Sequence, residues 1–314
     1  MAVQPTGAAR PPDRGPGLMP FTHRQAGAMG ITRRELQSRA YRKLLRGIYI
    51  RAEAPVGPYE ETRAALLAAS DGAFASHHTA ARLWGGIVPH SARAHVSVPR
   101  GRPRSPREDL AVHSSSRTPT SFRGQAVTTP LDTFLDCATA LDLLDLVILG
   151  DSLVRKRRIT TAELLEGCRR ATGRGARRAR TAAALVREGV DSAMETRARL
   201  LRVLSGLPEL ETDIRFYDER GRLRRRLDAG DRKTRTAVEY DGRQHVAREE
   251  QWESDIGRRE EFEDEAWRIV VLTSKDIYRT PGETVERLRR ILRARGMTIG
   301  PARDDWRRYF PGHP

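Results

Sequence analysis

The chain has 314 residues, which is enough for two or more domains that each bury a core. Hydrophobic residues make up 38% of it, aromatic residues 6% and charged residues 31%, which indicates globular domains with charged surfaces. No apolar run approaches the roughly 18 to 20 residues that span a bilayer, and the start lacks the apolar segment of a secretory signal. We expect a disordered leader over residues 1–19 and a cytoplasmic protein with no membrane partner.

The net charge of +16 is concentrated in two segments. Residues 1–50 contain nine Arg or Lys against two Asp or Glu, and residues 152–187 contain eleven against two. Concentrated positive charge attracts polyanions through counterion release, which indicates a nucleic acid partner. The alternative is a solvated surface in an Arg-biased chain, since only four of the 57 basic residues are Lys.

Residues 20–52 have the element order of a winged helix-turn-helix. The pattern predicts a short helix over residues 21–30 and a basic helix over residues 33–45, with Thr32 and Glu35 forming a capping box at its start. A short strand, the beginning of a wing, follows.

The basic helix carries the side chains that would read DNA. Such a helix enters the major groove, where Arg and Gln form hydrogen bonds with base edges. The alternative is a helical hairpin with a solvated face. The side chains that we expect to contact DNA are Arg33, Arg34, Gln37, Arg42 and Arg46.

Residues 53–170 are predicted as an α/β middle region, followed by a basic linker or helix over residues 171–187. In the middle region, helices are expected at residues 60–85, 130–150 and 161–170, and strands at residues 94–99 and 110–113.

His77 and His78 follow Ser76 at a predicted helix start. A metal or catalytic role would require partners at ligand spacing, and the neighbouring sequence offers none. We therefore expect a structural role for both. The two cysteines, Cys137 and Cys168, are too far apart for a CxxC metal site.

Three segments carry a family resemblance: FTHRQAGAMGITRRELQSRAYRKLLRGIYI, SHHTAARLWG and VTTPLDTFLDCATAL. They resemble the N-terminal winged-helix region of AbiEi-type antitoxins of actinobacteria, over about residues 20–170. The resemblance implies DNA binding and, as in that family, autoregulated transcription together with a toxin partner protein.

Residues 188–296 predict an α/β domain with the element order αβββαβα, followed by a tail over residues 297–314. The expected helices are residues 192–204, 248–266 and 281–295, and the expected strands are residues 213–217, 222–228, 236–241 and 267–273.

Acidic residues in this domain fall where a metal site would form. Strand side chains alternate, so Glu239 and Asp241 project to one face, and Asp228 on the neighbouring strand approaches Glu239. Glu195, from the preceding helix, would complete the set. Three convergent carboxylates suit Mg²⁺, and His245 is placed to exchange a proton with a nucleophile or leaving group.

Three of these residues have a structural alternative. Glu195 would complete a capping box with Ser192, and Asp228 would be a turn residue at a strand end. His245 would form a hydrogen bond within a loop.

The segments SAMETRARLL, RLD, AVEYDGRQH and WRIVVLT, with Asp255 and Arg258 between the last two, resemble the PD-(D/E)XK superfamily. The similarity is to the domain of unknown function 559, which is grouped with very-short-patch-repair endonucleases, and it implies a restriction-endonuclease-like fold. By this resemblance Asp228 and Glu239 would hold the metal. Asp241 takes the position that is usually Lys, a departure that the repair-endonuclease branch shares.

Two classes of function remain open. The first is a DNA-binding protein whose Mg²⁺-dependent nuclease domain hydrolyses phosphodiester bonds. The second is a non-catalytic, antitoxin-like regulator whose nuclease-like fold is a binding module, because a fold does not establish activity. An RNA-cutting nuclease would use the same site.

Overall fold

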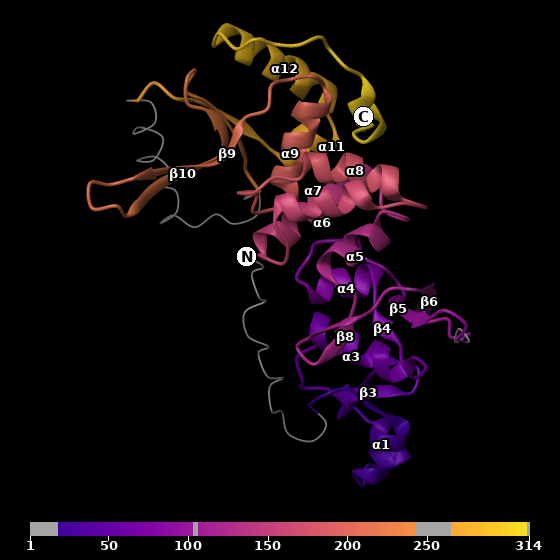
Figure 1. Ribbon diagram of the computed structural model, residues 1–314. Coiled ribbons are helices and arrows are strands. Elements are labelled where there is room, and N and C mark those ends of the chain that lie inside the picture. Colours follow the sequence, from indigo (N-terminus) through magenta and orange to yellow (C-terminus); the bar gives the residue numbers. More distant parts are fainter. Residues whose placement is uncertain (1–17, 103–105, 243–264, 313–314) are drawn as a thin grey trace. The chain divides into compact units, whose positions relative to one another are not determined.

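The computed structural model describes residues 18–102, 106–242 and 265–312, which form helices and several sheets (Figure 1). The chain is of mixed α and β class, as expected. It divides into two compact units, residues 1–184 and 185–314. No helix in the described ranges is long and apolar enough to cross a membrane.

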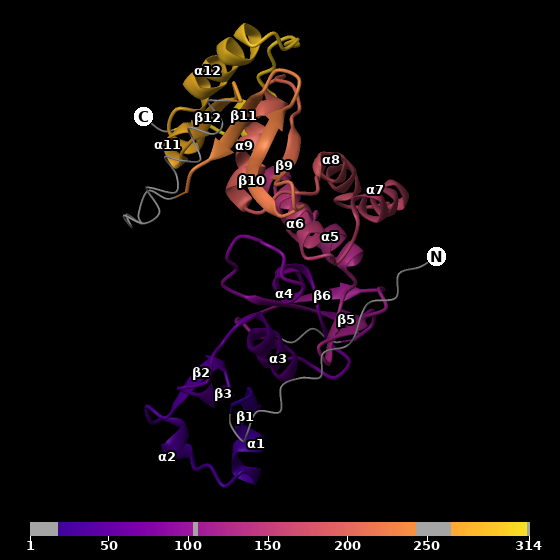
Figure 2. The ribbon, with the colours of Figure 1, turned by 90° about the vertical axis from the view of Figure 1, so that its left-hand side faces the viewer.

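The first unit begins with a small antiparallel sheet, of strand order β1-β3-β2, and two short helices (Figure 2). Its elements are β1 (Phe21–Thr22), α1 (His23–Ala28), α2 (Arg33–Leu36), β2 (Tyr41–Leu45) and β3 (Ile48–Arg51). Phe21, Ala26 and Leu36 are buried between the helices and the sheet.

The start of the second predicted helix is confirmed. The backbone N–H of Thr32 donates to Glu35 Oε2 at 2.7 Å, and the Glu35 N–H donates to Thr32 Oγ1 at 3.2 Å, so the capping box forms. The predicted extent of this helix, residues 33–45, is wrong, because α2 ends at Leu36.

Long-range pairing accounts for the short helix. Leu36 and Leu44 fit helical spacing, but residues 41–45 pair with β3 as the first strand of a hairpin. The Tyr41 ring also meets the Phe21 ring edge-on, with centroids 5.9 Å apart. Gly47 lies in the turn of this hairpin, with a φ of +77°.

A mixed sheet of order β6-β5-β4-β8-β7 forms the rest of the first unit's β structure. The strands are β4 (Phe74–Ala75), β5 (Ala94–Pro99), β6 (Leu110–Ser115), β7 (Thr120–Phe122) and β8 (Gln125–Val127). The helices are α3 (Pro58–Ala68), α4 (His77–Leu83), α5 (Pro130–Cys137), α6 (Leu143–Arg155), α7 (Thr161–Arg170) and α8 (Ala176–Leu185).

The middle region confirms some predicted elements and corrects others: the single helix expected over residues 60–85 is two helices, α3 and α4, with β4 between them. The strand at residues 94–99 and the helix at residues 161–170 are confirmed. The single helix expected over residues 130–150 is two helices, α5 and α6. The basic segment 171–187 contains the helix α8, and the boundary between the units falls at its end.

The second unit has a sheet of order β12-β11-β10-β9, with β11 and β12 parallel and the other neighbours antiparallel. Helices α9 and α11 pack against this sheet, and α12 packs on α9 (Figure 2). The elements are α9 (Ala193–Leu204), β9 (Glu211–Tyr217), β10 (Leu223–Asp231), β11 (Thr236–Tyr240), β12 (Arg268–Leu272), α11 (Ser274–Tyr278), α12 (Pro281–Ala294) and the 3₁₀ turn η1 (Asp305–Arg308).

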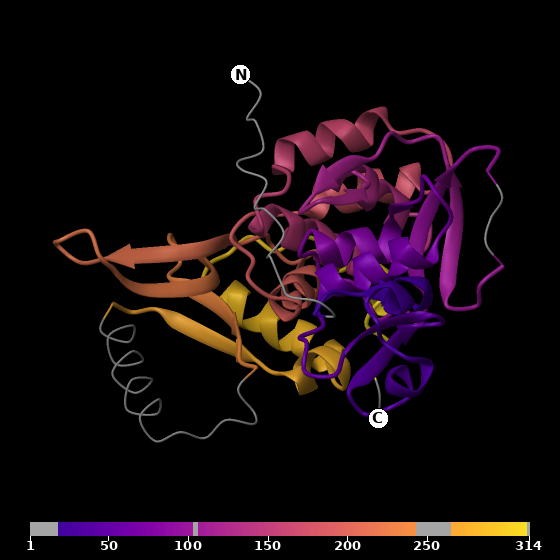
Figure 3. The same cartoon turned by 90° about the horizontal axis from the view of Figure 1, so that it is seen from below.

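In the described residues of this unit, the other predicted elements occur in the expected order, with α11 as an additional short helix between β12 and α12. The β9–β10 hairpin extends beyond the helices of its unit (Figure 3). The charged helix expected over residues 248–266 lies largely outside the described residues.

The segment after α12, which we expected to be a tail, packs on the second unit. Trp306 and Phe310 are buried, and η1 contacts α9. The Ser205 carbonyl, at the end of α9, accepts hydrogen bonds from the Arg303 N–H at 3.3 Å and from Arg289 Nη2 at 3.0 Å.

Candidate functional site: an acidic pocket under helix α9

Helix α9 carries the first acidic residue of the candidate site. Its cap is Ser192, whose Oγ accepts a hydrogen bond from the Glu195 N–H at 3.1 Å. The Glu195 carboxylate extends toward the residue before the cap, where its Oε2 accepts a hydrogen bond from the Asp191 N–H at 2.9 Å. Glu195 is therefore held at the first turn of the helix, where unpaired N–H groups favour negative charge.

The second acidic residue, Asp228, lies on β10. Its Oδ2 accepts a hydrogen bond from the backbone N–H of Tyr240 on β11 at 3.0 Å. The regular ladder between these strands begins next to it, with Ala229 opposite Val238. The Asp228 side chain thus joins the two strands beyond the last backbone pair of the ladder.

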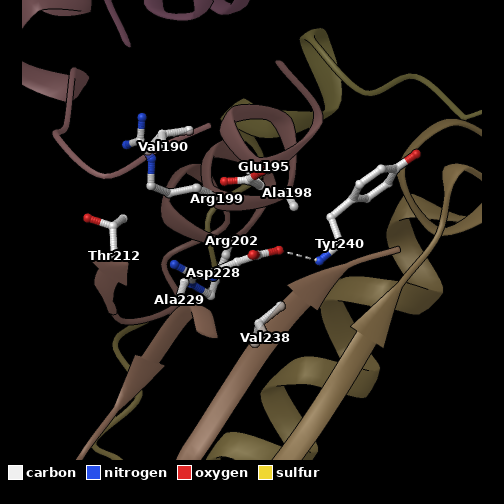
Figure 4. A pocket seen from close by; sticks show the side chains of 10 residues that line it. All are labelled: Val190, Glu195, Ala198, Arg199, Arg202, Thr212, Asp228, Ala229, Val238 and Tyr240. Carbon is white, nitrogen blue, oxygen red and sulfur yellow. Dashed lines mark hydrogen bonds between the residues drawn. The ribbon is translucent and has the colours of Figure 1, made fainter. Parts of the chain in front are cut away.

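Glu195 and Asp228 line the same small pocket (Figure 4). Its volume is about 20 Å³, which is room for about one water molecule or one ion. The lining residues come from α9, β9, β10, β11 and the segment before α9: Val190, Glu195, Ala198, Arg199, Arg202, Thr212, Asp228, Ala229, Val238 and Tyr240.

The two carboxylates influence each other. Burial raises the pKa of Glu195, the Asp191 N–H opposes this shift, and the nearby Asp228 carboxylate raises the pKa further. The two acidic side chains therefore lie close enough to repel each other when both are ionised.

Sequence reasoning missed the basic side of the pocket. Arg202 is 1% exposed, and burial lowers the pKa of its guanidinium to about 10, with Arg199 adding to the shift. Its Nε donates to the Pro208 carbonyl at 3.2 Å, while its Nη2 is buried with no hydrogen-bond partner among the described residues. An Arg on a helix normally indicates a solvated face, so the sequence held no signal of this burial.

Two carboxylates of the pocket, Glu195 and Asp228, could hold a metal ion, and Arg199 and Arg202 line the same pocket. Mg²⁺ takes hard oxygen ligands, keeps several waters and is commonly held by one or two protein carboxylates. A divalent cation would also offset the repulsion that raises the pKa of Glu195.

Glu239, the other expected metal ligand, does not line this pocket. Val238 and Tyr240 on either side of it do, and strand side chains alternate, so Glu239 projects to the opposite face of β11. Asp241 also lies outside the lining, and its backbone N–H donates to the Leu272 carbonyl at 2.8 Å.

His245, the remaining residue of the predicted site, lies outside the described residues, as do Asp255 and Arg258 of the family resemblance.

In the first unit, the residues expected to contact DNA separate into two groups. Arg33, Arg34 and Gln37 are exposed on α2 and at its C-cap. Arg42 and Arg46 are also exposed but belong to the β2–β3 hairpin instead of the helix.

The two hairpin residues have local partners. Arg42 Nη2 donates to the Ala54 carbonyl. The backbone of Arg46 is held by two side chains: its N–H donates to Asp109 Oδ2 at 2.8 Å and its carbonyl accepts from Arg107 Nη2 at 2.7 Å. The geometry fixes the hairpin turn, with the Arg46 side chain exposed.

The structure also corrects the expectation that His77 has no partner for a metal. One nitrogen each from His77, His95 and His113 lie within 4.8 Å of one another. Among the described residues, these three side chains are the group whose potential metal-binding atoms lie this close together. No local motif indicated this group, because the three residues come from α4, β5 and β6 and are far apart along the chain.

Comparisons with known proteins add little. No protein-family model matches the chain, and no curated protein matches it. Among solved structures, the chain is similar to the crystal structure of RV2827C protein from Mycobacterium tuberculosis, with a TM-score of 0.36 and 17% sequence identity over 63% of this chain and 84% of that chain.

Proposed function

We propose that this protein binds DNA through its first unit and hydrolyses phosphodiester bonds, with Mg²⁺, at the acidic pocket of its second unit. The observation that carries the proposal is the meeting of Glu195 and Asp228, from α9 and β10, at one pocket. A helix carboxylate beside a strand carboxylate is also what a restriction-endonuclease-like domain would provide, and we propose that fold for residues 188–296.

The residues of the pocket would have separate roles. Asp228 and Glu195 would hold the ion, and the Tyr240 N–H would fix the orientation of the Asp228 carboxylate. Arg199 and Arg202 would balance the negative charge from the inner side of the pocket. The bound ion would lower the pKa of a water and offset charge on the phosphate.

DNA binding would rest on the exposed basic side chains around α2. We propose that residues 20–52 act as a winged helix-turn-helix with a shortened second helix, in which α2 carries Arg33, Arg34 and Gln37. The β2–β3 hairpin would be the wing, and the Arg46 side chain at its turn would contact the backbone phosphates.

The test uses the purified full-length protein with supercoiled plasmid, single-stranded DNA and RNA, each with Mg²⁺, with Mn²⁺ and with EDTA. The variants are Asp228→Asn and Glu195→Gln, which preserve shape. The matched control is Glu211→Gln, because Glu211 is an exposed carboxylate on β9, paired with Arg232 and outside the pocket. We expect metal-dependent cutting that both pocket variants lose and the control retains.

Cutting that persists in both pocket variants would place the chemistry elsewhere. DNA binding without cutting under any condition would favour the second candidate, a non-catalytic regulator similar to an antitoxin, which would act with a toxin partner. The projection of Glu239 away from the pocket is the observation that favours this alternative.

A further inference from the structure

A cluster of four histidines lies in the first unit, apart from the residues that the proposed function uses. His77 is the first residue of α4, and His78 follows it. His95 lies on β5 and His113 on β6. Strands β5 and β6 are parallel, with Ser97 opposite His113, so His95 and His113 lie on the same face two positions apart.

The ring nitrogens of three of these residues converge. His95 Nδ1 lies 3.1 Å from His113 Nε2. Two imidazole nitrogens bound to one tetrahedral zinc ion, at about 2.05 Å each, are about 3.3 Å apart. His77 completes the group, since its nitrogen and the other two lie within 4.8 Å of one another.

Neighbouring hydroxyls orient the rings. Ser91 Oγ donates to the Arg93 carbonyl at 2.9 Å and therefore accepts from His95 Nε2, 3.0 Å away. This leaves the lone pair of His95 on Nδ1, which faces His113. Metal-binding imidazoles are commonly fixed in this way, by a hydrogen bond from the nitrogen that does not bind the metal.

His77 is held in the cluster at a conformational cost. Its φ is +48°, in the left-handed region that few residues other than Gly adopt, and its Nδ1 lies 3.0 Å from the buried Ser76 Oγ. Such strain persists where the surrounding structure requires it, often at binding sites. The next residue, His78, has a buried Nδ1 with no hydrogen-bond partner among the described residues.

We propose that His77, His95 and His113 bind one Zn²⁺ ion. Imidazole nitrogen is a preferred ligand of Zn²⁺, and three protein ligands leave the fourth tetrahedral position to a water molecule. His78, whose ring centroid is 4.6 Å from that of His95, is close enough to form a hydrogen bond with that water. The site joins α4 to strands β5 and β6, so zinc would stabilise the first unit.

Binding requires one rearrangement. The His77 and His113 rings are stacked, with centroids 3.7 Å apart and an angle of 15° between their planes. A metal ion lies near the plane of each imidazole that binds it, so one of the two rings must turn about its Cβ–Cγ bond. Two cations lie near the cluster: Arg117, which is paired with Asp132 and Asp136, and Arg93, which is exposed to solvent.

The test measures Zn²⁺ binding to the full-length protein, without an affinity tag, by competition with a coloured chelator. Co²⁺ is then used as a probe, because four-coordinate Co²⁺ absorbs visible light strongly. The variants are His95→Ala and His113→Ala, and the control is His90→Ala, an exposed histidine outside the cluster. Circular dichroism without metal checks that each variant folds.

We expect one ion per chain in the wild type and the control, an increased Tm with zinc, and a loss of affinity of about tenfold or more in each cluster variant. No stoichiometric binding in the wild type, or unchanged binding in both variants, would overturn the proposal. X-ray absorption of the zinc-loaded wild type provides a test that needs no variant: fewer than three imidazoles around the ion would also overturn it.

Discussion

The carboxylate of Asp228 accepts a hydrogen bond from the backbone N–H of Tyr240 at 3.0 Å, and the same side chain lines the acidic pocket with Glu195. Asp228 therefore supports the sheet as well as the proposed metal site. A variant that removes its carboxylate changes both roles at once, so the two roles need two different substitutions.

We predict that Asp228→Ala lowers the free energy of unfolding by about 1–3 kcal/mol, because the Tyr240 N–H loses a charged acceptor. Asp228→Asn keeps an acceptor oxygen and should lose less stability. Urea denaturation of the two variants measures the difference. Equal stability of Asp228→Ala and the wild type would show that the bond contributes nothing.

The local signals in the sequence predicted the local structure correctly. Thr32 and Ser192 cap the helices that they were expected to cap, because the groups involved lie within three residues. The prediction of a helix over residues 33–45 was wrong because residues 41–45 pair with β3. The helical spacing of the leucines does not encode this pairing.

The candidate site could be predicted only in part for the same reason. Glu195 and Asp228 were expected to approach each other, and both line the pocket. Strand alternation sets the direction of Glu239, but the face that meets α9 is decided by packing of the whole unit. The approach of His95 and His113 depends on the register of two parallel strands, which no short motif specifies.

We predict that Arg33→Ala combined with Arg34→Ala weakens DNA binding by about tenfold or more, and reduces the slope of log affinity against log salt by about 2 if both contact phosphates. Fluorescence anisotropy over a range of salt concentrations measures both quantities. Arg82→Ala is the control, because Arg82 is an exposed Arg of the same unit paired with Glu61. An unchanged slope in the double variant would exclude α2 as a phosphate-binding element.

Asp136 should make the first unit less stable as pH rises. Burial raises the pKa of its carboxyl to about 6, against the opposing effect of Arg117. A group with a raised pKa in the folded state stabilises the fold below its unfolded pKa, near 4, and loses this contribution as pH rises through about 6.

The test compares the free energy of unfolding of the wild type with that of Asp136→Asn at each pH. From pH 4 to 7 the free energy of unfolding of the wild type should fall relative to that of the variant, which lacks the titrating group. Thermal or urea denaturation at several pH values measures this difference. A difference that stays constant with pH would contradict the raised pKa.

Two glycines in the second unit allow the effect of backbone strain to be distinguished from that of steric contact. A Cβ at Gly206, whose φ is +81°, would lie 2.4 Å from the Pro301 carbonyl oxygen. Gly221 has a φ of +71° and nothing within 4 Å of the same position. Both Ala variants should be strained, by about 1 kcal/mol, but only Gly206→Ala should also displace the segment that packs on α9.

The measurement is the Tm of each glycine variant, together with protease cleavage in the segment around Arg303. We expect a larger loss of stability and faster cleavage for Gly206→Ala than for Gly221→Ala. Equal values would mean that the C-terminal segment moves without cost.

Among the described residues, every sheet is assembled within one unit: the strands of the first unit lie between residues 21 and 127, and those of the second between residues 211 and 272. During synthesis the chain emerges N-terminus first at about 5–20 residues per second. The first unit can therefore complete its sheets on the ribosome while the second is still being made. A nascent chain that ends near residue 185 would already present the proposed DNA-reading surface and the histidine cluster, before any acidic pocket exists.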